Sequence, residues 1–463
     1  MDLHELFNIS YEGICAVTSV ETDSRRCTPG SLFFAMSGRT TSGERFVEQA
    51  LAQGAVAVVA TTPMTLSVPV VVVDEKLLHS ELVRACGRVY GIPHETLRLL
   101  GVTGTNAKTS ITTIASQLWR ALGHPSDVIG TVTHERTTPA PAEMHQLLAA
   151  SSRSSLPEDP TLMCLEVSSH ALDQGRTDGI FFDVVVFSNL THDHLDYHHS
   201  MEEYFEAKSK LFTPTSARNF VVWVDDPYGA RLADRVGNSV VRVSRANARN
   251  ISCGSEGSDF EWRGYRVRSS LLGGYNVDNL LLALEALVIL GGDPEALAHA
   301  CATLRPVTGR FDIVQAANPM IVIDYAHSPD GLRRVLVDAR EFSGSGRLII
   351  VFGASGERDV EKRPGMGAVT GENADVVIVT SESPRFEDPE SIIDDIVKGI
   401  PAGARWHREI DRRAAIELAL RIAEPNDIVI LAGKGHENVR YIQGEVVPFN
   451  DRTVVTELLQ TRI

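Results

Sequence analysis

The sequence predicts an α/β protein of three domains, with a parallel sheet in the central domain. Short, nearly continuous apolar runs alternate with helical patterns along the chain, as in parallel sheets that helices cover on both faces. At 463 residues the chain is too long for a single hydrophobic core. Stretches near residues 95 and 305 contain the proline and glycine typical of links between domains.

The first domain is predicted over residues 1–95 and is the smallest. Its apolar runs are "GSLFFAM", "AVAVVA" and "PVVVV". Runs of this length and composition favour short strands, so we expect a small α/β unit.

The central domain is predicted over residues 96–304. A β-rich run at 97–104 leads into "GVTGTNAKTS" and then into a helical pattern from Thr109 to Leu122. The apolar side chains of that pattern recur at spacings of three and four, at Ile111, Ile114, Leu118 and Leu122. Further strands are predicted at "TLMCLEVS", "VVVFSNL" and "FVVWV". This order of strand, loop and helix fits a parallel-sheet domain of the P-loop, ATPase-like kind, and an ordinary strand-to-helix turn fits it as well.

The third domain is predicted over residues 305–463. It repeats the alternation of strand and helix with "MIVIDYA", "LIIVFGAS", "DVVIVTS" and "DIVILAGKG". These four apolar strands separated by helical segments predict a Rossmann-like α/β domain.

Charge and composition exclude several classes of protein. The net charge of −16 argues against a dedicated partner of nucleic acid or of an anionic membrane. The six cysteines are scattered without a CxxC pair, which is typical of free thiols in a reducing compartment. The amino terminus is acidic, and no apolar run approaches the roughly 18 residues that cross a bilayer. We therefore expect a cytoplasmic protein.

The segment "GVTGTNAKTS", Gly101–Ser110, resembles a phosphate-binding loop with one glycine missing. Lys108 and Thr109 are present, but Ala107 stands where a glycine is expected before the lysine. If the backbone there has φ < 0, alanine costs little, whereas φ > 0 costs roughly 1 kcal/mol or more. The loop alone leaves two alternatives open, a nucleotide site and an ordinary strand-to-helix turn.

The loop and eight further segments decide between them. In chain order they are "TGTNAKTS", "LEVSSHALDQGR", "FSNLTHDHLDYHHSMEEYFEAKSKLF", "GGYNVDNLLLAL", "TGRFDIV", "IDYAHSPDGL", "FGASGERDVEKRP", "SESPRFEDP" and "LAGKGHENVRY". Together they resemble the Mur ligase family, and within it the MurE type, over nearly the whole chain. The family's loop reads GTNGKT, so Ala107 is its only real departure here.

The resemblance implies an ATP-dependent ligase. A carboxylate of UDP-N-acetylmuramoyl-L-alanyl-D-glutamate would be activated by ATP as an acyl phosphate, and an amino acid's amine would displace phosphate. Such a site must neutralise and align anions with Mg²⁺ and cationic side chains. The chain would act in peptidoglycan precursor synthesis, as a monomer with small-molecule substrates.

The resemblance assigns nucleotide and metal contacts. Residues expected at the nucleotide are Gly104, Thr105, Asn106, Ala107, Lys108, Thr109, Asn276, Asn279, Arg310, Asp324 and His327. Thr109, Glu166 and His194 are expected at Mg²⁺, and Lys208 matches a lysine that CO₂ carbamylates. Lys108, Lys208, His194 and Arg310 would carry the catalysis. Read without the family, Asn279 is equally a helix N-cap and Lys208 a lysine on an amphipathic helix. The neighbours of His194, among them Asp193, are expected to be mostly indirect or solvated.

The resemblance also assigns the substrate contacts. Ser24 and Arg25 are expected at the uridine diphosphate, although Ser42 stands where the family usually has aspartate. Residues expected at the muramoyl dipeptide are Thr137, Thr138, Ser168, Gln174 and Arg176. A structural salt bridge is the alternative interpretation of Arg176.

The third domain is expected to select the amino acid. Arg358, Ser383, Arg385, Gly433 and Glu437 match the set that binds meso-diaminopimelate, where the family motif reads DNPR and this chain has Glu382-Ser383-Pro384-Arg385. A buried Arg385 without an anion would cost several kcal/mol, and the lost asparagine donor at Ser383 about 1 kcal/mol. The retained arginine predicts an amino acid with a distal carboxylate, meso-diaminopimelate.

The substitutions at Ala107, Glu382 and Ser383 keep two alternatives open. One is a divergent ligase that uses another amino acid or acceptor in a specialised pathway. The other is a non-catalytic nucleotide-binding homologue, against which Lys108, Thr109, Glu166, His194 and Lys208 all argue.

Overall fold

A computed structural model describes residues 1–8, 14–38, 41–92, 94–134, 136–315 and 319–460. The chain forms two compact units. The first comprises Met1–Leu99 and His124–Asp183, and the second comprises Leu100–Gly123 and Val184–Ile463. Each unit is described by itself.

The first unit begins with a four-stranded parallel sheet in the order β1-β2-β3-β4. Its strands are β1 (Ser19–Glu21), β2 (Ser31–Phe34), β3 (Ala55–Ala60) and β4 (Val70–Val72). Its helices are α1 (Leu3–Phe7), α2 (Val47–Ala52) and α3 (Glu75–Tyr90), with short 3₁₀ turns at Ser24–Arg26 and Gly43–Phe46. The three predicted apolar strands are confirmed.

The rest of the first unit contains a parallel pair of strands and two helices. Strand β6 (Ser126–Ile129) pairs with β7 (Thr161–Glu166). Helix α5 (Pro141–Arg153) begins with proline, which suits the first helical position because its missing N–H has no partner there. The short α6 (Ser169–Asp173) is capped by the Ser168 hydroxyl.

The second unit contains the phosphate-loop strand. The strand order is β10-β9-β8-β5, and β5 pairs with β8 in parallel. These strands are β5 (Leu97–Thr103), β8 (Phe182–Phe187), β9 (Ala217–Trp223) and β10 (Val240–Val243). The accompanying helices are α4 (Lys108–Ala121), α7 (Leu195–His198), α8 (Met201–Ser209), α9 (Pro227–Val236), α10 (Gly274–Ile289) and α11 (Pro294–Ala300). The predicted helix after the loop is confirmed, with Ile111, Ile114 and Leu118 buried.

An antiparallel sheet, β11 (Ala248–Gly254), β12 (Gly257–Trp262) and β13 (Tyr265–Ser269), precedes α10. Two further 3₁₀ turns lie at Arg245–Asn247 and Cys301–Thr303.

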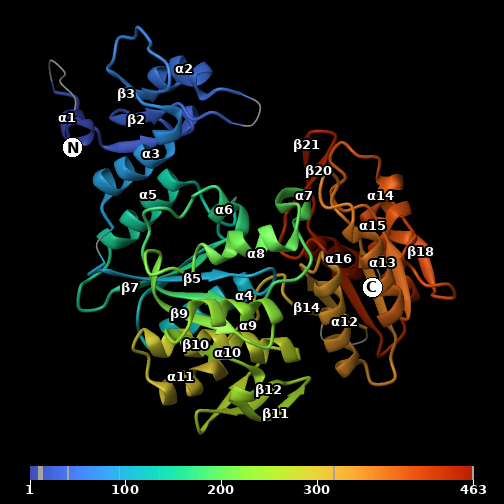
Figure 1. Ribbon diagram of the computed structural model, residues 1–463. Coiled ribbons are helices and arrows are strands. Elements are labelled where there is room, and N and C mark those ends of the chain that lie inside the picture. Colours follow the sequence, from blue (N-terminus) through green and yellow to red (C-terminus); the bar gives the residue numbers. More distant parts are fainter. Residues whose placement is uncertain (9–13, 39–40, 93, 135, 316–318, 461–463) are drawn as a thin grey trace. The chain divides into compact units, whose positions relative to one another are not determined.

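The carboxyl-terminal part of the second unit is a sheet covered on both faces, drawn in orange and red in Figure 1. Its order is β14-β15-β19-β16-β17-β18, and only the edge strand β14 pairs antiparallel. The strands are β14 (Asp312–Gln315), β15 (Met320–Asp324), β16 (Leu348–Phe352), β17 (Val376–Val379), β18 (Trp406–Arg408) and β19 (Ile428–Ala432). The helices are α12 (Pro329–Ser343), α13 (Lys362–Asn373), α14 (Pro389–Val397), α15 (Arg412–Ile422) and α16 (Asp451–Gln460), and a hairpin joins β20 (Val439–Ile442) to β21 (Glu445–Pro448).

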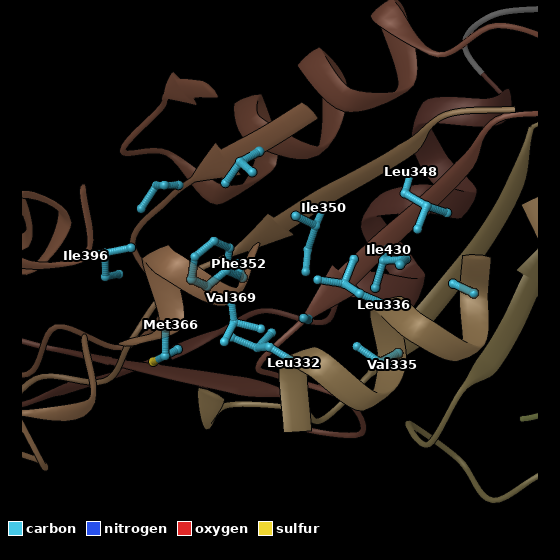
Figure 2. Packing of buried hydrophobic residues seen from close by; sticks show 14 of the residues in the cluster. Leu332, Val335, Leu336, Leu348, Ile350, Phe352, Met366, Val369, Ile396 and Ile430 are labelled. Carbon is cyan, nitrogen blue, oxygen red and sulfur yellow. The ribbon is translucent and has the colours of Figure 1, made fainter. Parts of the chain in front are cut away.

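Alternate strand residues face opposite layers of this sheet. Ile350 and Phe352 pack against Leu332, Leu336 and Met366 on the face covered by α12, α13 and α14 (Figure 2). The opposite face packs against α15 and α16. Because both faces are buried, the inner strands β15, β16, β17 and β19 are almost entirely apolar, which is the pattern seen in the sequence.

In the part of the chain that the structure describes, no helix combines the length and apolar character needed to cross a membrane.

Candidate active site

The phosphate loop lies between β5 and the first turn of α4, where backbone N–H groups favour an anion. Ala107 has φ = 74°, in the left-handed region. Of the two backbone conformations considered for Ala107, the structure therefore has the one with φ > 0. In that conformation a residue with a Cβ costs about 1–2 kcal/mol. At Gly104 a Cβ would lie 1.9 Å from Ser188 Oγ, so only glycine fits against β8.

Two residues that follow β8 hold this loop in shape. Asn189 Oδ1 accepts the Asn106 N–H at 2.9 Å, and the Asn189 carbonyl accepts the Thr105 N–H at 2.9 Å. The Ser188 hydroxyl donates to the Asn106 carbonyl at 2.7 Å. Sequence reasoning missed both residues, although their position directly after an apolar strand was a usable signal.

Two lysines converge on one carbonyl of the loop. Lys108 Nζ donates to the carbonyls of Gly104 (2.8 Å) and Thr105 (2.9 Å), and Lys208 Nζ donates to that of Gly104 at 2.9 Å. Lys208 is fully buried on α8. Burial first, and the charge of Lys108 second, hold the pKa of Lys208 well below its usual value. The Lys208 amine is therefore driven toward its neutral, nucleophilic form.

Arg310 reaches the loop from the segment before β14. Its Nη2 donates to Thr109 Oγ1 at 3.0 Å, and its guanidinium lies 4.3 Å from the centre of the Tyr325 ring. Asp324, at the end of β15, accepts the Phe311 and Ala326 N–H groups, both at 2.7 Å. Asp324 thus anchors the backbone next to Arg310.

The loop after β8 carries His194 in a left-handed conformation, φ = 58°. The preceding Asp193 is buried, and its Oδ1 accepts the His194 N–H at 3.0 Å. His327 also approaches this carboxylate, with Nε2 3.6 Å from Asp193 Oδ2. Of the two expected alternatives, indirect or solvated, solvation does not apply to Asp193, because its polar partners lie inside the protein. Its expected indirect role stays a prediction.

Glu166 ends β7 in the first unit and is buried. It accepts the Thr131 N–H at 2.9 Å through Oε1 and the Thr131 hydroxyl at 3.2 Å through Oε2. A Cβ at Gly130 would lie 2.1 Å from Glu166 Oε1, so the glycine leaves room for this carboxylate. An ordered carboxylate and the Thr109 hydroxyl are oxygen donors of the kind Mg²⁺ prefers, and Mg²⁺ usually keeps waters besides.

Most of the residues expected at the muramoyl dipeptide lie together in the first unit. The Thr138 hydroxyl donates to the Glu166 carbonyl at 2.8 Å and lies 3.3 Å from Ser168 Oγ. Arg176 donates to the Thr138 carbonyl at 3.0 Å and, through Nη2, to Gln174 Oε1 at 2.6 Å. Thr137 Oγ1 lies 3.1 Å from the hydroxyl of Thr131. The structure brings these groups to the carboxyl end of β7.

The predicted uridine-diphosphate residues lie at the first 3₁₀ turn. The Ser24 hydroxyl donates to Gln49 Oε1 at 2.7 Å, and Arg25 pairs with Asp23 at 2.6 Å. Ser42 caps the second 3₁₀ turn by accepting the Glu44 N–H.

The two asparagines expected near adenine line different cavities beside α10. Asn276 lines one of about 260 Å³ together with Ser110 and Arg310, and Asn279 lines one of about 240 Å³ together with Asn189. The two asparagine side chains are hydrogen-bonded to each other, since Asn279 Nδ2 donates to Asn276 Oδ1 at 2.9 Å. The alternative interpretation of Asn279 as an N-cap is wrong, because it lies inside α10, whose N-cap is Gly273.

The expected amino-acid contacts follow strands β16, β17 and β19. Arg385 has φ = 56° and lies with its guanidinium 5.5 Å from the Tyr441 ring centre, and its Nε has no partner among the described residues. Ser383 Oγ accepts the Tyr441 N–H at 3.4 Å. Glu437 pairs with Lys434 at 2.9 Å, and Gly433 lies against the Glu382 side chain. Arg358 is exposed on the loop after β16.

Glu382, which departs from the family motif, is buried. Its Oε1 accepts the Ser355 hydroxyl at 2.7 Å, while Oε2 has no hydrogen-bond partner among the described residues. The sequence showed the substitution but not its burial.

Comparisons with known proteins identify the family. Three family models match in succession: "Mur ligase family, catalytic domain" at residues 16–100, "Mur ligase middle domain" at 102–287, and "Mur ligase, glutamate ligase domain" at 309–435. A UDP-N-acetylmuramoyl-L-alanyl-D-glutamate–2,6-diaminopimelate ligase of Xylella fastidiosa (strain 9a5c) is 40% identical, over 96% of this chain and 94% of its own.

The chain belongs to the Mur ligase family. The enzyme of the same name from Geobacillus kaustophilus is 38% identical to this Mur ligase, over 98% of the chain and 97% of its own length. A solved structure of a protein so named is 31% identical, with a TM-score of 0.66, and covers 100% of this chain and 99% of its own. A MurF ligase of Thermotoga maritima in complex with ADP has the same fold at 18% identity and a TM-score of 0.67, with 96% of each chain covered.

These likenesses confirm the predicted family and the three-domain α/β fold. As a Mur ligase, the protein is an ATP-dependent ligase.

Proposed function

We propose that this Mur ligase adds diaminopimelate to UDP-N-acetylmuramoyl-L-alanyl-D-glutamate in peptidoglycan precursor synthesis, with release of ADP and phosphate. The observation that carries the proposal is the likeness, at about 40% identity over nearly the full length, to ligases named for this reaction. The retained Arg385 supports the choice of amino acid.

ATP would be held by the phosphate loop and the cation of Lys108. The loop's shape is set by Ser188 and Asn189, so its N–H groups are arranged before any ligand contact. Arg310, anchored by Asp324, would place a second cation at the phosphates from the carboxyl-terminal part. The acceptor carboxylate would attack the terminal phosphorus, and the incoming amine would then displace phosphate from the acyl carbon.

For adenine we propose the cavity lined by Asn276. Ser110, which follows Lys108 and Thr109, and Arg310 line the same cavity, so a nucleotide with phosphates on the loop reaches it directly. The Asn276 amide offers both a donor and an acceptor to a base edge.

Magnesium would be held by Thr109 and Glu166, with His194 as a further ligand. The ion would supply charge neutralisation at the phosphates. Glu166 is held in place by Thr131, and the His194 backbone by Asp193.

Lys208 would be carbamylated by CO₂ and so become an anion. Only a neutral amine adds to CO₂, and burial beside Lys108 favours that form. A carbamate would also remove the repulsion between the two lysines that share the Gly104 carbonyl.

Arg385 would bind the distal carboxylate of the amino acid, with the distal ammonium near Glu437. An arginine whose Nε lacks a partner in the described structure is suited to a charged acceptor. Glu382 supports a second candidate function, a divergent ligase that uses another amino acid. Its Oε2 has no hydrogen-bond partner among the described residues and would accept from a cationic group of that amino acid.

We further propose that the enzyme acts in the cytoplasm as a monomer, with the muramoyl dipeptide and a free amino acid as its partners.

The test is phosphate release from ATP with the muramoyl dipeptide and a panel of amino acids. Meso-diaminopimelate, lysine, ornithine and glutamate separate a requirement for a distal carboxylate from one for a distal ammonium. Turnover with diaminopimelate, with the tripeptide product identified by mass, supports the proposal. Turnover only with another amine supports the divergent ligase, and binding of ATP without turnover supports a non-catalytic homologue.

A further inference from the structure

A buried ion pair joins the loop after β8, which carries Asp193 and His194, to the carboxyl-terminal part of the second unit. Lys362 Nζ lies 3.1 Å from Asp193 Oδ1, and the two side chains are only 9% and 5% exposed. Asp193 lies within the matched middle domain and Lys362 within the matched glutamate ligase domain. The pair therefore crosses from one family domain to the other inside one compact unit.

The Asp193 carboxylate also contacts the turn that carries His194. The oxygen that meets Lys362 also accepts the His194 N–H at 3.0 Å. The other oxygen lies 3.7 Å from His194 Nε2 and 3.6 Å from His327 Nε2. One carboxylate thus contacts both the backbone and the ring of His194.

The start of α13 is tied to the same loop a second time. Asp359 Oδ1 accepts the Lys362 N–H at 3.3 Å, and Asp359 Oδ2 lies 3.8 Å from His192 Nδ1. His192 and Asp193 are therefore both met by the one turn that begins α13.

Lys362 is poorly placed for helix stability alone. It occupies the first position of α13, where the helix dipole disfavours a cation. A buried pair must also overcome the desolvation of both charges, and apolar replacements are often no worse for stability. His194 needs outside support as well, because its left-handed backbone is unfavourable for a residue with a Cβ.

We infer that Lys362 is a positioning residue for the metal site: by pairing with Asp193 it fixes the His194 turn when the carboxyl-terminal domain is docked. Docking then orders the metal loop and brings Arg310 to Thr109 together. This inference rests on the proposed role of His194 as a metal ligand.

The test compares Lys362→Met with Lys398→Met. Lys398 is an exposed lysine of the same domain that follows α14 and pairs with Asp395, and it serves as the control. For Lys362→Met we expect the Mg²⁺ concentration at half-maximal rate to rise about 10- to 100-fold and kcat to fall, as when a ligand's supporting partner is removed. KM for the amino acid should stay within about twofold. The control should match the wild type.

A double-mutant cycle with Asp193→Asn identifies the route of the effect. If Lys362 acts through Asp193, adding Lys362→Met to Asp193→Asn changes the Mg²⁺ dependence little further. Additive effects would overturn the inference. So would a Lys362→Met variant with a lower unfolding temperature but the wild-type Mg²⁺ dependence, since that is a structural role only.

Mn²⁺ binding in the presence of ADP, followed by electron paramagnetic resonance, gives a readout that needs no turnover. Weaker Mn²⁺ binding by Lys362→Met supports the inference even if the wild type adds no diaminopimelate, which would defeat only the proposed function. Equal Mn²⁺ affinity overturns it. If Lys362→Met does not fold, Lys362→Gln, which removes the charge but keeps a polar side chain, is measured in the same way and judged by the same outcomes.

Discussion

Ala107 places a methyl group on the phosphate loop at φ = 74°, where glycine would be unstrained. Ser188 and Asn189 hold the neighbouring Asn106 by hydrogen bonds, and the positive φ of Ala107 is present in the protein without a ligand. The strain therefore belongs to the folded chain and is not created when ATP binds. At the scale of one residue, the substitution should affect stability more than nucleotide affinity.

Ala107→Val tests how much the loop tolerates. A β-branched residue at positive φ costs about 1–3 kcal/mol, so we expect a matching fall in the free energy of unfolding and a higher KM for ATP as the loop shifts. Ala121→Val, at an exposed helical position of α4, should cost about 0.5 kcal/mol or less.

Ala107→Gly should change the KM for ATP by less than about twofold; a large fall would mean that the methyl obstructs the phosphates. Urea unfolding and initial rates measure these quantities.

Lys208 gives a second prediction at this scale. Enzyme kept free of CO₂ should lose activity by about tenfold or more and regain it with bicarbonate, because the neutral amine takes up CO₂ and releases a proton. Lys208→Met should be inactive in both conditions, whereas the exposed Lys210→Met should respond like the wild type. Activity that is indifferent to bicarbonate would contradict the carbamate.

Arg385 gives a third prediction at the scale of one residue. Arg385→Met should lower kcat/KM for diaminopimelate by roughly 30-fold or more, because a distal carboxylate would be left without its partner. Lysine has no such carboxylate, so its kcat/KM should change less and the preference for diaminopimelate should shrink. Arg413→Met, which removes an exposed arginine paired with Glu457, is the control. An unchanged preference would place the distal carboxylate elsewhere.

Much of the candidate site could be proposed from the sequence, because its expected chemistry depends on residue type and order. Lys108, Thr109, Glu166, Lys208 and Arg310 stand in motifs that the sequence displays. The partners that hold them were less visible. Lys362 meets Asp193 across 169 positions of sequence, and the pairing is set by packing alone.

Helix α5 contains a buried histidine that its sequence pattern does not distinguish from a polar surface residue. His145 is 1% exposed, and neither ring nitrogen has a hydrogen-bond partner of good geometry among the described residues. Burial lowers the pKa of His145 to about 4, against a slight opposing effect of the Asp178 backbone. Burial of this ring therefore favours its neutral form.

The stability of the first unit should fall with acid because of His145. The unfolded state takes up a proton near pH 6.5, before the folded state does, so stability is full above that pH and declines as the pH falls toward 4. The total is on the order of 3 kcal/mol. Urea unfolding from pH 7.5 to 4.5 should show a shallower decline in His145→Leu. His124→Leu, at an exposed position, should keep the wild-type slope; equal slopes for all three proteins would refute the assignment.

The helices and strands could be predicted closely from the local spacing of apolar residues. The helix expected from Thr109 to Leu122 is observed at Lys108–Ala121, because its apolar spacing matches one buried face. Asn279 was ambiguous because an N-cap and a helix interior both accept asparagine locally. Only the position of Gly273, with the Asn276 contact, decides it.

At the scale of the whole molecule, the residues of the reaction divide between two compact units. Glu166 and the expected acceptor contacts belong to the first, while the phosphate loop, Lys208, Arg310 and Arg385 belong to the second. The buried Glu166 carboxylate and the phosphate loop therefore belong to different compact units. The boundaries predicted near residues 95 and 305 remain predictions about the family's domains.

The most direct test of this account follows one oxygen atom. With ¹⁸O in the reacting glutamate carboxylate of the acceptor, attack on ATP and displacement by diaminopimelate should transfer one labelled oxygen to each phosphate released, visible by mass spectrometry or by the ³¹P shift. Phosphate that leaves without the label, although the peptide product forms, would contradict activation of the acceptor by ATP.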